Sequence, residues 1–173
     1  CQYDLRCCIG RIHTALELER IGHRFGRPAL VHLKIDTGMS RYGIRWTDAL
    51  PCIEHIRQLK WVRLEGVFSH FAMSDEADKT FALEQLRRLN LVLEQMQARN
   101  ITVKYRHLCN SGGFLDLPMA HLDMVRCGIL PLGVYPSQVC RRLPGIAPVM
   151  QIKCRLAAIQ HVQTGDTVGY GMR

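Results

Sequence analysis

The sequence lacks the features of a membrane-spanning or exported chain. None of its apolar runs approaches the roughly 18 residues that a transmembrane helix requires. Its opening stretch, CQYDLRCCIG, has neither the basic start nor the continuous apolar centre of a signal peptide. We therefore expect a soluble protein of the cytoplasm that has no membrane partner. The chain also lacks an initiator methionine, and we expect it to be a segment of a longer protein.

The eight cysteines form no C-x-x-C pair and show no spacing typical of zinc ligands, so no metal site is expected. Free thiols in a reducing compartment are the simplest interpretation. A disulfide framework is the alternative, but such frameworks usually belong to much smaller secreted domains.

A concentrated basic surface is also missing, although the formal net charge is +8. The longest basic runs are the pairs Arg87-Arg88 and Arg141-Arg142, with no aromatic residues between basic ones. Nucleic-acid-binding surfaces cluster their basic residues, so no nucleic-acid partner is expected. Solvated helix faces explain most of the charge, and a site for an anionic small molecule can use the rest.

What the sequence does contain is an alternation of helix-like and strand-like segments. Apolar spacing predicts helices over residues 5–24, 47–60 with Thr47 as N-cap, 82–96 with an end at Asn100, and a short one after residue 111. Strand-like runs lie between them, at residues 29–35, 62–72, 101–111 and 124–129.

This alternation implies parallel strands joined by helical crossovers. We expect an α/β fold, the second half of an eight-stranded (β/α)8 TIM-type barrel, whose complete form has about 250 residues. A doubly wound open sheet gives a similar pattern, but no G-x-G-x-x-G follows the first strand. Residues 1–132 are expected to form the partial barrel, with four strands after an initial helix. Residues 133–145 are expected to form a linker, and 146–173 the beginning of an all-β domain.

Polar residues gather at the expected strand ends, where the active site of such a barrel lies. Ser111, followed by two glycines at a helix start, offers the hydroxyl and backbone N–H groups that bind phosphate. An N-cap with a flexible turn is the alternative. Arg126 has apolar neighbours and should therefore have a definite partner. His70, taken alone, is most often a merely packed histidine.

Five motifs in order resemble the alanine racemase family, from about residue 29 to residue 170: KIDTGMSRYGI, HFAMSDE, CNSGG, VRCGILPLGVYPS and VGYG. The resemblance implies a pyridoxal 5'-phosphate enzyme that interconverts L- and D-alanine by proton transfer between two bases, supplying D-alanine for peptidoglycan. It also implies a barrel followed by a β-domain, and a homodimer whose subunits share their active sites.

The resemblance assigns five residues to the cofactor. Ser111 and the backbone of Gly128 and Ile129 would hold the phosphate. His70 would pack against the cofactor ring, and Arg126 would face the pyridine nitrogen. An arginine there leaves that nitrogen unprotonated, which weakens the electron sink and disfavours side reactions such as transamination.

Three further residues take roles at the substrate in this resemblance. Arg41 would lie near the substrate carboxylate, and Tyr170 would be the base on one face of the α-carbon, in the partner subunit's site. The lysine at the place of Lys34 is often carbamylated in the family, and its negative charge could then pair with Arg41.

The other base of the family, a Schiff-base lysine in an N-terminal motif, is not found in this sequence. We therefore expect that the segment alone neither closes a stable barrel nor racemises alanine. Two alternatives remain open: a serine or broad-specificity amino-acid racemase of the same family, and a non-catalytic cofactor-binding or regulatory protein built on a half barrel.

Overall fold

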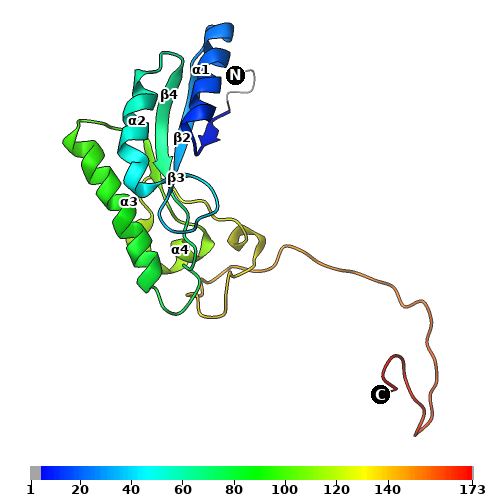
Figure 1. Cartoon of the computed structure of the whole chain (residues 1–173). Helices are drawn as coiled ribbons and strands as arrows, with labels where there is room; N and C mark the ends of the chain where they lie inside the picture. The colour runs from blue at the N-terminus through cyan, green and yellow to red at the C-terminus, as the bar shows by residue number, and fades with distance from the viewer. Residues whose placement is uncertain (1–4, 173) are drawn as a thin grey trace.

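A parallel sheet with helices forms the body of the protein in the computed structural model, which describes residues 5–172 (Figure 1). Four of its strands lie side by side in the order β1 (Cys7–Ile9), β2 (Ala29–Asp36), β4 (Val62–Phe68) and β5 (Tyr105–His107). The short β3 (Ile44–Arg45) pairs with the end of β2. The connecting helices are α1 (Ile12–Phe25), α2 (Ala49–Gln58) and α3 (Thr80–Ala98), and α4 (Ser111–Asp116) follows β5. Short 3-10 helices span Trp46–Asp48, Pro118–Ala120 and Leu130–Leu132.

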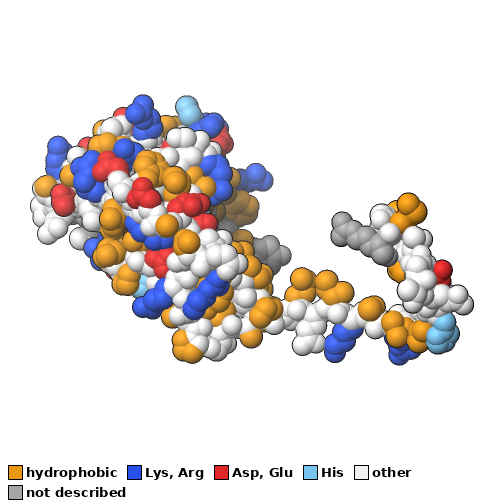
Figure 2. Space-filling model, turned by 90° about the horizontal axis from the view of Figure 1, so that it is seen from below, with side chains coloured by type: hydrophobic (Ala, Val, Ile, Leu, Met, Phe, Trp, Pro, Cys, Tyr) orange, Lys and Arg blue, Asp and Glu red, His pale blue; other side chains and the backbone are white. Residues whose placement is uncertain are grey.

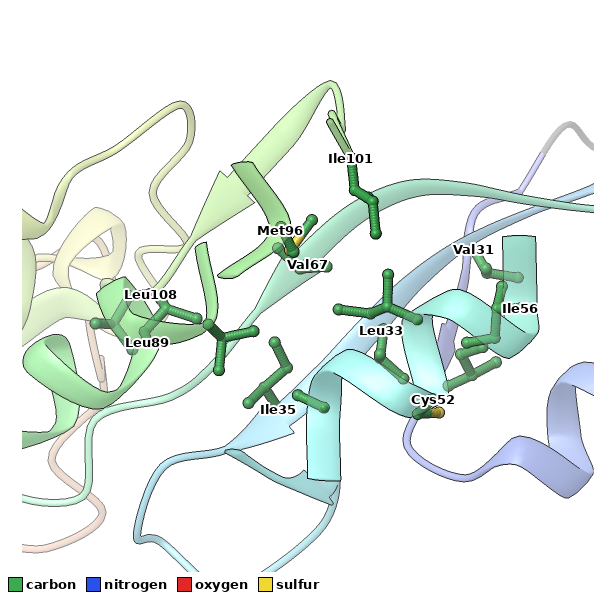
Figure 3. Packing of buried hydrophobic residues seen from close by; sticks show 14 of the residues in the cluster. Val31, Leu33, Ile35, Cys52, Ile56, Val67, Leu89, Met96, Ile101 and Leu108 are labelled. Carbon is green, nitrogen blue, oxygen red and sulfur yellow. The ribbon is translucent and has the colours of Figure 1, made fainter. Parts of the chain in front are cut away.

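The order of these strands in space follows their order in the chain. A doubly wound sheet reverses this order at a switch point, whereas a (β/α)8 barrel keeps it. One face of β2 packs against the helices, with Val31, Leu33 and Ile35 buried in one core with Ile56 of α2 and Leu89 of α3 (Figure 3). The expectation of an α/β fold of the barrel type is confirmed.

The opposite face of the sheet is polar. Because side chains alternate along a strand, Lys34 points away from the face that Leu33 and Ile35 form. In the strand register Lys34 aligns with Phe68, and Phe68 aligns with His107. The sheet therefore places Lys34, Phe68 and His107 in a row on the face opposite Leu33 and Ile35.

Two of the expected helix starts are wrong. Residues 7–9 form β1 instead of helix, because they pair with β2, a tertiary contact that local periodicity does not reveal. Thr47 is not the N-cap of α2: it lies in a 3-10 turn, and its hydroxyl donates to the side chain of Asp48 at 3.2 Å. The end of α3 is as expected, since Asn100 follows it in the left-handed conformation with φ of 53°.

The strand expected at residues 124–129 is also wrong. Only Met124 forms a bridge, to His107, and beyond it the N–H of Arg126 donates to the carbonyl of Cys109 at 2.9 Å. The physical reason is that β5 ends at His107, so no strand edge continues beside this segment. Arg126 is consequently held in a loop.

The last part of the chain leaves the body. Residues 147–172 contain no helix or strand and extend outward with exposed apolar side chains, among them Met150 and Ile152 (Figures 1 and 2). A β-run without a neighbouring strand has no partner for its backbone groups, and the all-β domain stays a prediction. The segment expected as a linker packs back on α4, where Cys140 and Leu115 are buried together. Within residues 5–172, no helix is both long and apolar enough to cross a membrane.

Candidate active site

Polar side chains from separate elements meet at the ends of β2, β4 and β5. Lys34 lies in β2, His70 follows β4, His107 ends β5, and Arg126 comes from the loop beyond. The carboxyl ends of parallel strands share one edge of a sheet, so residues far apart in sequence converge there.

The guanidinium of Arg126 is the centre of this group. One amino nitrogen lies 2.5 Å from Nδ1 of His107, and the other donates to the carbonyl of Ser69 at 2.9 Å and lies 3.3 Å from Nδ1 of His70. It also stacks over the ring of Phe68, 4.9 Å from the centroid. The arginine thus has the definite partners expected for it, yet none of these contacts is a carboxylate.

The two histidines that face Arg126 are held neutral. Burial, reinforced by the charge of Arg126, lowers the pKa of His70 to about 4 and the pKa of His107 to about 3. A neutral imidazole can accept a hydrogen bond from a guanidinium, whereas a protonated one cannot. Among residues 5–172 no carboxylate contacts the Arg126 guanidinium, which is therefore a suitable partner for an anionic ligand or an aromatic nitrogen.

Lys34 is buried, with 6% of its surface exposed. Burial lowers its pKa to about 8, and the charges of Arg126 and Arg41 act in the same direction, while Asp36 opposes them. Its Nζ lies 5.8 Å above the ring of Phe68 and donates a long hydrogen bond to the carbonyl of Ile35. A larger fraction of this amine is neutral near pH 8 than in an exposed lysine, so it is the more nucleophilic.

Arg41 is placed by the loop that follows β2. Oδ1 of Asp36 accepts hydrogen bonds from the N–H groups of Gly38, Met39 and Ser40, at 3.0 to 3.1 Å, which fixes the turn. Arg41 itself is exposed, and its guanidinium has no hydrogen-bond partner within residues 5–172. The structure places its charge close enough to lower the pKa of Lys34 and His70 without contact.

Gln85 of α3 forms hydrogen bonds to two loops of the site. Its amide oxygen accepts from the N–H of Ala72 at 2.8 Å, and its amide nitrogen donates to the hydroxyl of Thr37 and the carbonyl of His70. The Thr37 hydroxyl lies 2.7 Å from that of Ser69. The loops after β2 and β4 are therefore held to the same helix.

Ser111 and Gly128 are brought together as expected. The Ser111 hydroxyl accepts from the N–H groups of Gly128, at 3.0 Å, and Leu130, at 3.3 Å, so its own hydrogen remains available to an anion. A Cβ added at Gly128 would meet no atom within 4 Å, so open space lies beside this backbone. Asn110 is the N-cap of α4 and accepts from Gly113. The helix cap at Asn110 and the open space at Gly128 therefore occur together, so one does not exclude the other.

The structure does not bring Tyr170 to this cluster. The residue is fully exposed in the extended segment after residue 147, and Ile129 is exposed beside Gly128. Both roles therefore stay predictions.

Three polar residues escaped the sequence interpretation: the buried Gln85 and His107, and the half-buried His32. The sequence positions of two of these residues could have revealed them. His107, like Lys34, stands in a strand, and Gln85 occupies the apolar face of α3 between Ala82 and Leu89. A polar residue at a core position marks either a satisfied network or a site.

Comparison with known proteins gives a consistent result. Residues 1–136 match the family model described as alanine racemase, N-terminal domain. An alanine racemase of Carboxydothermus hydrogenoformans is 41% identical over 98% of this chain and 46% of its own length. One from Desulfovibrio desulfuricans is 41% identical over 89% of this chain and 42% of its own length.

Solved structures are similar as well. An alanine racemase of Clostridium difficile superimposes with a TM-score of 0.86 at 29% identity, over 98% of this chain and 45% of that one. One from Bacillus anthracis, with bound L-Ala-P, has a TM-score of 0.80 at 25% identity, over 99% of this chain and 45% of that one. The chain spans about half the length of the curated relatives it matches.

Proposed function

This chain belongs to the alanine racemase family, and from that premise we propose that it supplies cofactor-binding and substrate-binding residues to an enzyme that interconverts L- and D-alanine. The observation that carries the proposal is Arg126: a half-buried arginine whose contacts are neutral histidines, carbonyls and an aromatic ring. With no carboxylate among these contacts, the guanidinium can serve as donor to an acceptor such as a pyridine nitrogen.

The residues fit pyridoxal 5'-phosphate, which when bound withdraws electrons from the α-carbon of an amino acid. Ser111 supplies a hydroxyl, and the space beside Gly128 leaves room for a phosphate next to the backbone of Gly128 and Ile129. His70 would lie against the ring. Arg126 would donate to the ring nitrogen and keep it unprotonated, because a guanidinium does not give up its proton.

Arg41 and Tyr170 would act on the amino acid itself. Arg41 is an exposed cation without a hydrogen-bond partner among the described residues, and it would bind the substrate carboxylate. Tyr170 would exchange a proton with one face of the α-carbon. In the proposed homodimer Tyr170, which is exposed in this structure, would lie in the partner subunit's site.

Lys34 would be carbamylated. Its burial and lowered pKa favour the neutral amine that reacts with carbon dioxide, and the product is an anion. The anion would pair with Arg41 in a charge-assisted hydrogen bond and hold the guanidinium towards the substrate.

The proposed product, D-alanine, would serve peptidoglycan synthesis, and the enzyme would work in the cytoplasm. The test is racemisation by the protein produced from the intact gene, with L-alanine, L-serine and L-lysine compared at equal concentration in the presence of the cofactor. We expect L-alanine to be turned over fastest. Residues 1–173 alone should form no D-alanine. Faster turnover of serine or lysine, or none of any substrate, would overturn the proposal.

A further inference from the structure

A continuous line of side chains crosses the face of the sheet opposite the helices and ends at Arg126. Nδ1 of His107 faces Arg126 at 2.5 Å, and Nε2 of His107 lies 2.8 Å from Nδ1 of His32. Nε2 of His32 lies 3.5 Å from a carboxylate oxygen of Glu65, which Arg6 also contacts at 3.1 Å. Strands β2, β4 and β5, the segment before β1 and the loop that carries Arg126 thus contribute to one chain of polar contacts.

Local backbone features build this line. Val31 pairs with Leu64 but His32 pairs with Gly66, so Glu65 is an extra residue in β4 and forms a bulge. Bulges redirect side chains, and this one turns Glu65 towards His32. Gly66 makes room for the imidazole, since a Cβ there would lie 2.8 Å from two ring atoms of His32.

The chemistry of the two ends gives the line one direction. A guanidinium only donates, so Nδ1 of His107 must accept, and the hydrogen of this neutral ring must lie on Nε2. That hydrogen is donated to Nδ1 of His32, which places the hydrogen of His32 on its own Nε2. A carboxylate only accepts, and Glu65 receives this last hydrogen.

We propose that Glu65 and His32 are positioning residues that fix the tautomer of His107 and through it the orientation of the Arg126 guanidinium. The carboxylate selects one of two opposite hydrogen-bond directions. With that direction reversed, His107 would present N–H to the N–H of Arg126, and the arginine would turn away from the place where it meets a ring nitrogen. The functional consequence rests on the proposed racemase function, but the tautomers do not.

The test is a two-bond proton–nitrogen correlation spectrum of the full-length protein with nitrogen-15 histidine, the signals assigned by His32→Gln and His107→Gln. In the unsubstituted protein both rings should carry hydrogen on Nε2. Glu65→Gln should raise the share of His107 that carries hydrogen on Nδ1, because an amide can either donate or accept, and Arg126 is then the only end of the line that still favours hydrogen on Nε2. Glu54→Gln, which removes a carboxylate that pairs with Arg99 between α2 and α3, is the matched control and should leave both tautomers unchanged.

Kinetics provide the second measurement. In metal sites, replacing a residue that hydrogen-bonds to a metal ligand typically lowers affinity or activity 10- to 100-fold. By analogy, Glu65→Gln should lower kcat about tenfold, and Glu65→Asp should recover part of that loss. Hydrogen on Nδ1 of His107 in the unsubstituted protein would overturn the proposal even if Glu65→Gln does not fold. So would identical spectra and rates for Glu65→Gln and Glu54→Gln. A third result separates the two proposals. If both rings carry hydrogen on Nε2, Glu65→Gln changes the tautomer of His107 and the protein racemises no amino acid, the result supports this inference and counts against the proposed function.

Discussion

The side-chain amide of Gln85 accepts a hydrogen bond from the backbone N–H of Ala72 at 2.8 Å. Its other end is bound to Thr37 and to the carbonyl of His70. A single buried side chain of α3 therefore joins the loops that carry Arg41 and His70.

Replacing Gln85 by leucine should destabilise the protein. The substitution leaves the half-buried N–H of Ala72 without its acceptor and removes the donor to Thr37 and to the carbonyl of His70, and each such unsatisfied group costs about 1–3 kcal/mol. We expect a loss of about 3 kcal/mol in the free energy of unfolding, measured by urea titration. Gln95→Leu, on an exposed part of the same helix, should stay within about 0.5 kcal/mol. Equal losses for the two variants would show that the amide contacts contribute nothing.

Ser111→Ala should weaken binding of pyridoxal 5'-phosphate and leave binding of pyridoxal, which has no phosphate, nearly unchanged. A hydrogen bond to a charged group contributes about 1.5–3 kcal/mol, so the dissociation constant should rise about 10- to 100-fold. Fluorescence titration of both compounds measures the ratio. Ser137→Ala, which removes a hydroxyl that donates to the carbonyl of Asp75, is the control. Similar losses for both compounds would place the phosphate elsewhere.

Carbamylation of Lys34 should be visible by carbon-13 spectroscopy after equilibration with labelled bicarbonate. One carbamate signal is expected, and Lys34→Ala should remove it and lower racemisation. Acetate or chloride should restore part of the activity by supplying the missing negative charge. Lys60→Ala, at an exposed lysine, should keep the signal. A signal that persists in Lys34→Ala would reject the assignment.

The low pKa of His107 predicts an acid dependence of stability. Burial, with the charge of Arg126, lowers this pKa from 6.5 to about 3 in the folded protein, so between these values the unfolded chain binds more protons. The stability from a neutral His107 is complete above pH 6.5 and is lost as the pH falls towards 3. One proton corresponds to a slope of about 1.4 kcal/mol per pH unit. Unfolding titrations should show a shallower slope for His107→Gln, and parallel curves would exclude His107 as the group responsible.

Gly66→Ala should disturb the sheet, because the added methyl group would lie 2.8 Å from the His32 ring and from the carbonyl of Tyr105. Overpacking of this kind costs about 1–3 kcal/mol. Gly128→Ala, whose methyl group meets open space, should leave the melting temperature unchanged while it weakens cofactor binding. Calorimetry measures the melting temperature of both variants. The expectation fails if Gly66→Ala has the same melting temperature as the unsubstituted protein.

Much of the fold could be predicted from apolar spacing. The periodic face of α3 predicts a helix that buries Leu86 and Leu89, and both are buried. The wrong predictions concern segments whose secondary structure depends on a strand that is distant in the sequence. Residues 7–9 become a strand through β2, and residues 124–129 fail to become one because β5 ends beside them.

The candidate site divides in the same way. Residue types, their order and the family resemblance that they carry were enough to single out Lys34, His70, Ser111 and Arg126, because polar side chains within and after strands are visible in the chain itself. The partners of Arg126 were not, since His107 is 19 positions away and His32 reaches His107 across 75.

The sequence by itself determined which segments become helices and strands for most of the body, and which side chains are candidates to bind phosphate, to donate to a ring nitrogen or to react as an amine. Only the tertiary structure decided that Glu65, His32 and His107 line up behind Arg126, and that Gln85 joins two loops. The physical reason is that propensity and periodicity act over a few neighbouring residues. Hydrogen-bond direction and pKa depend instead on groups that the sheet brings together from across the chain.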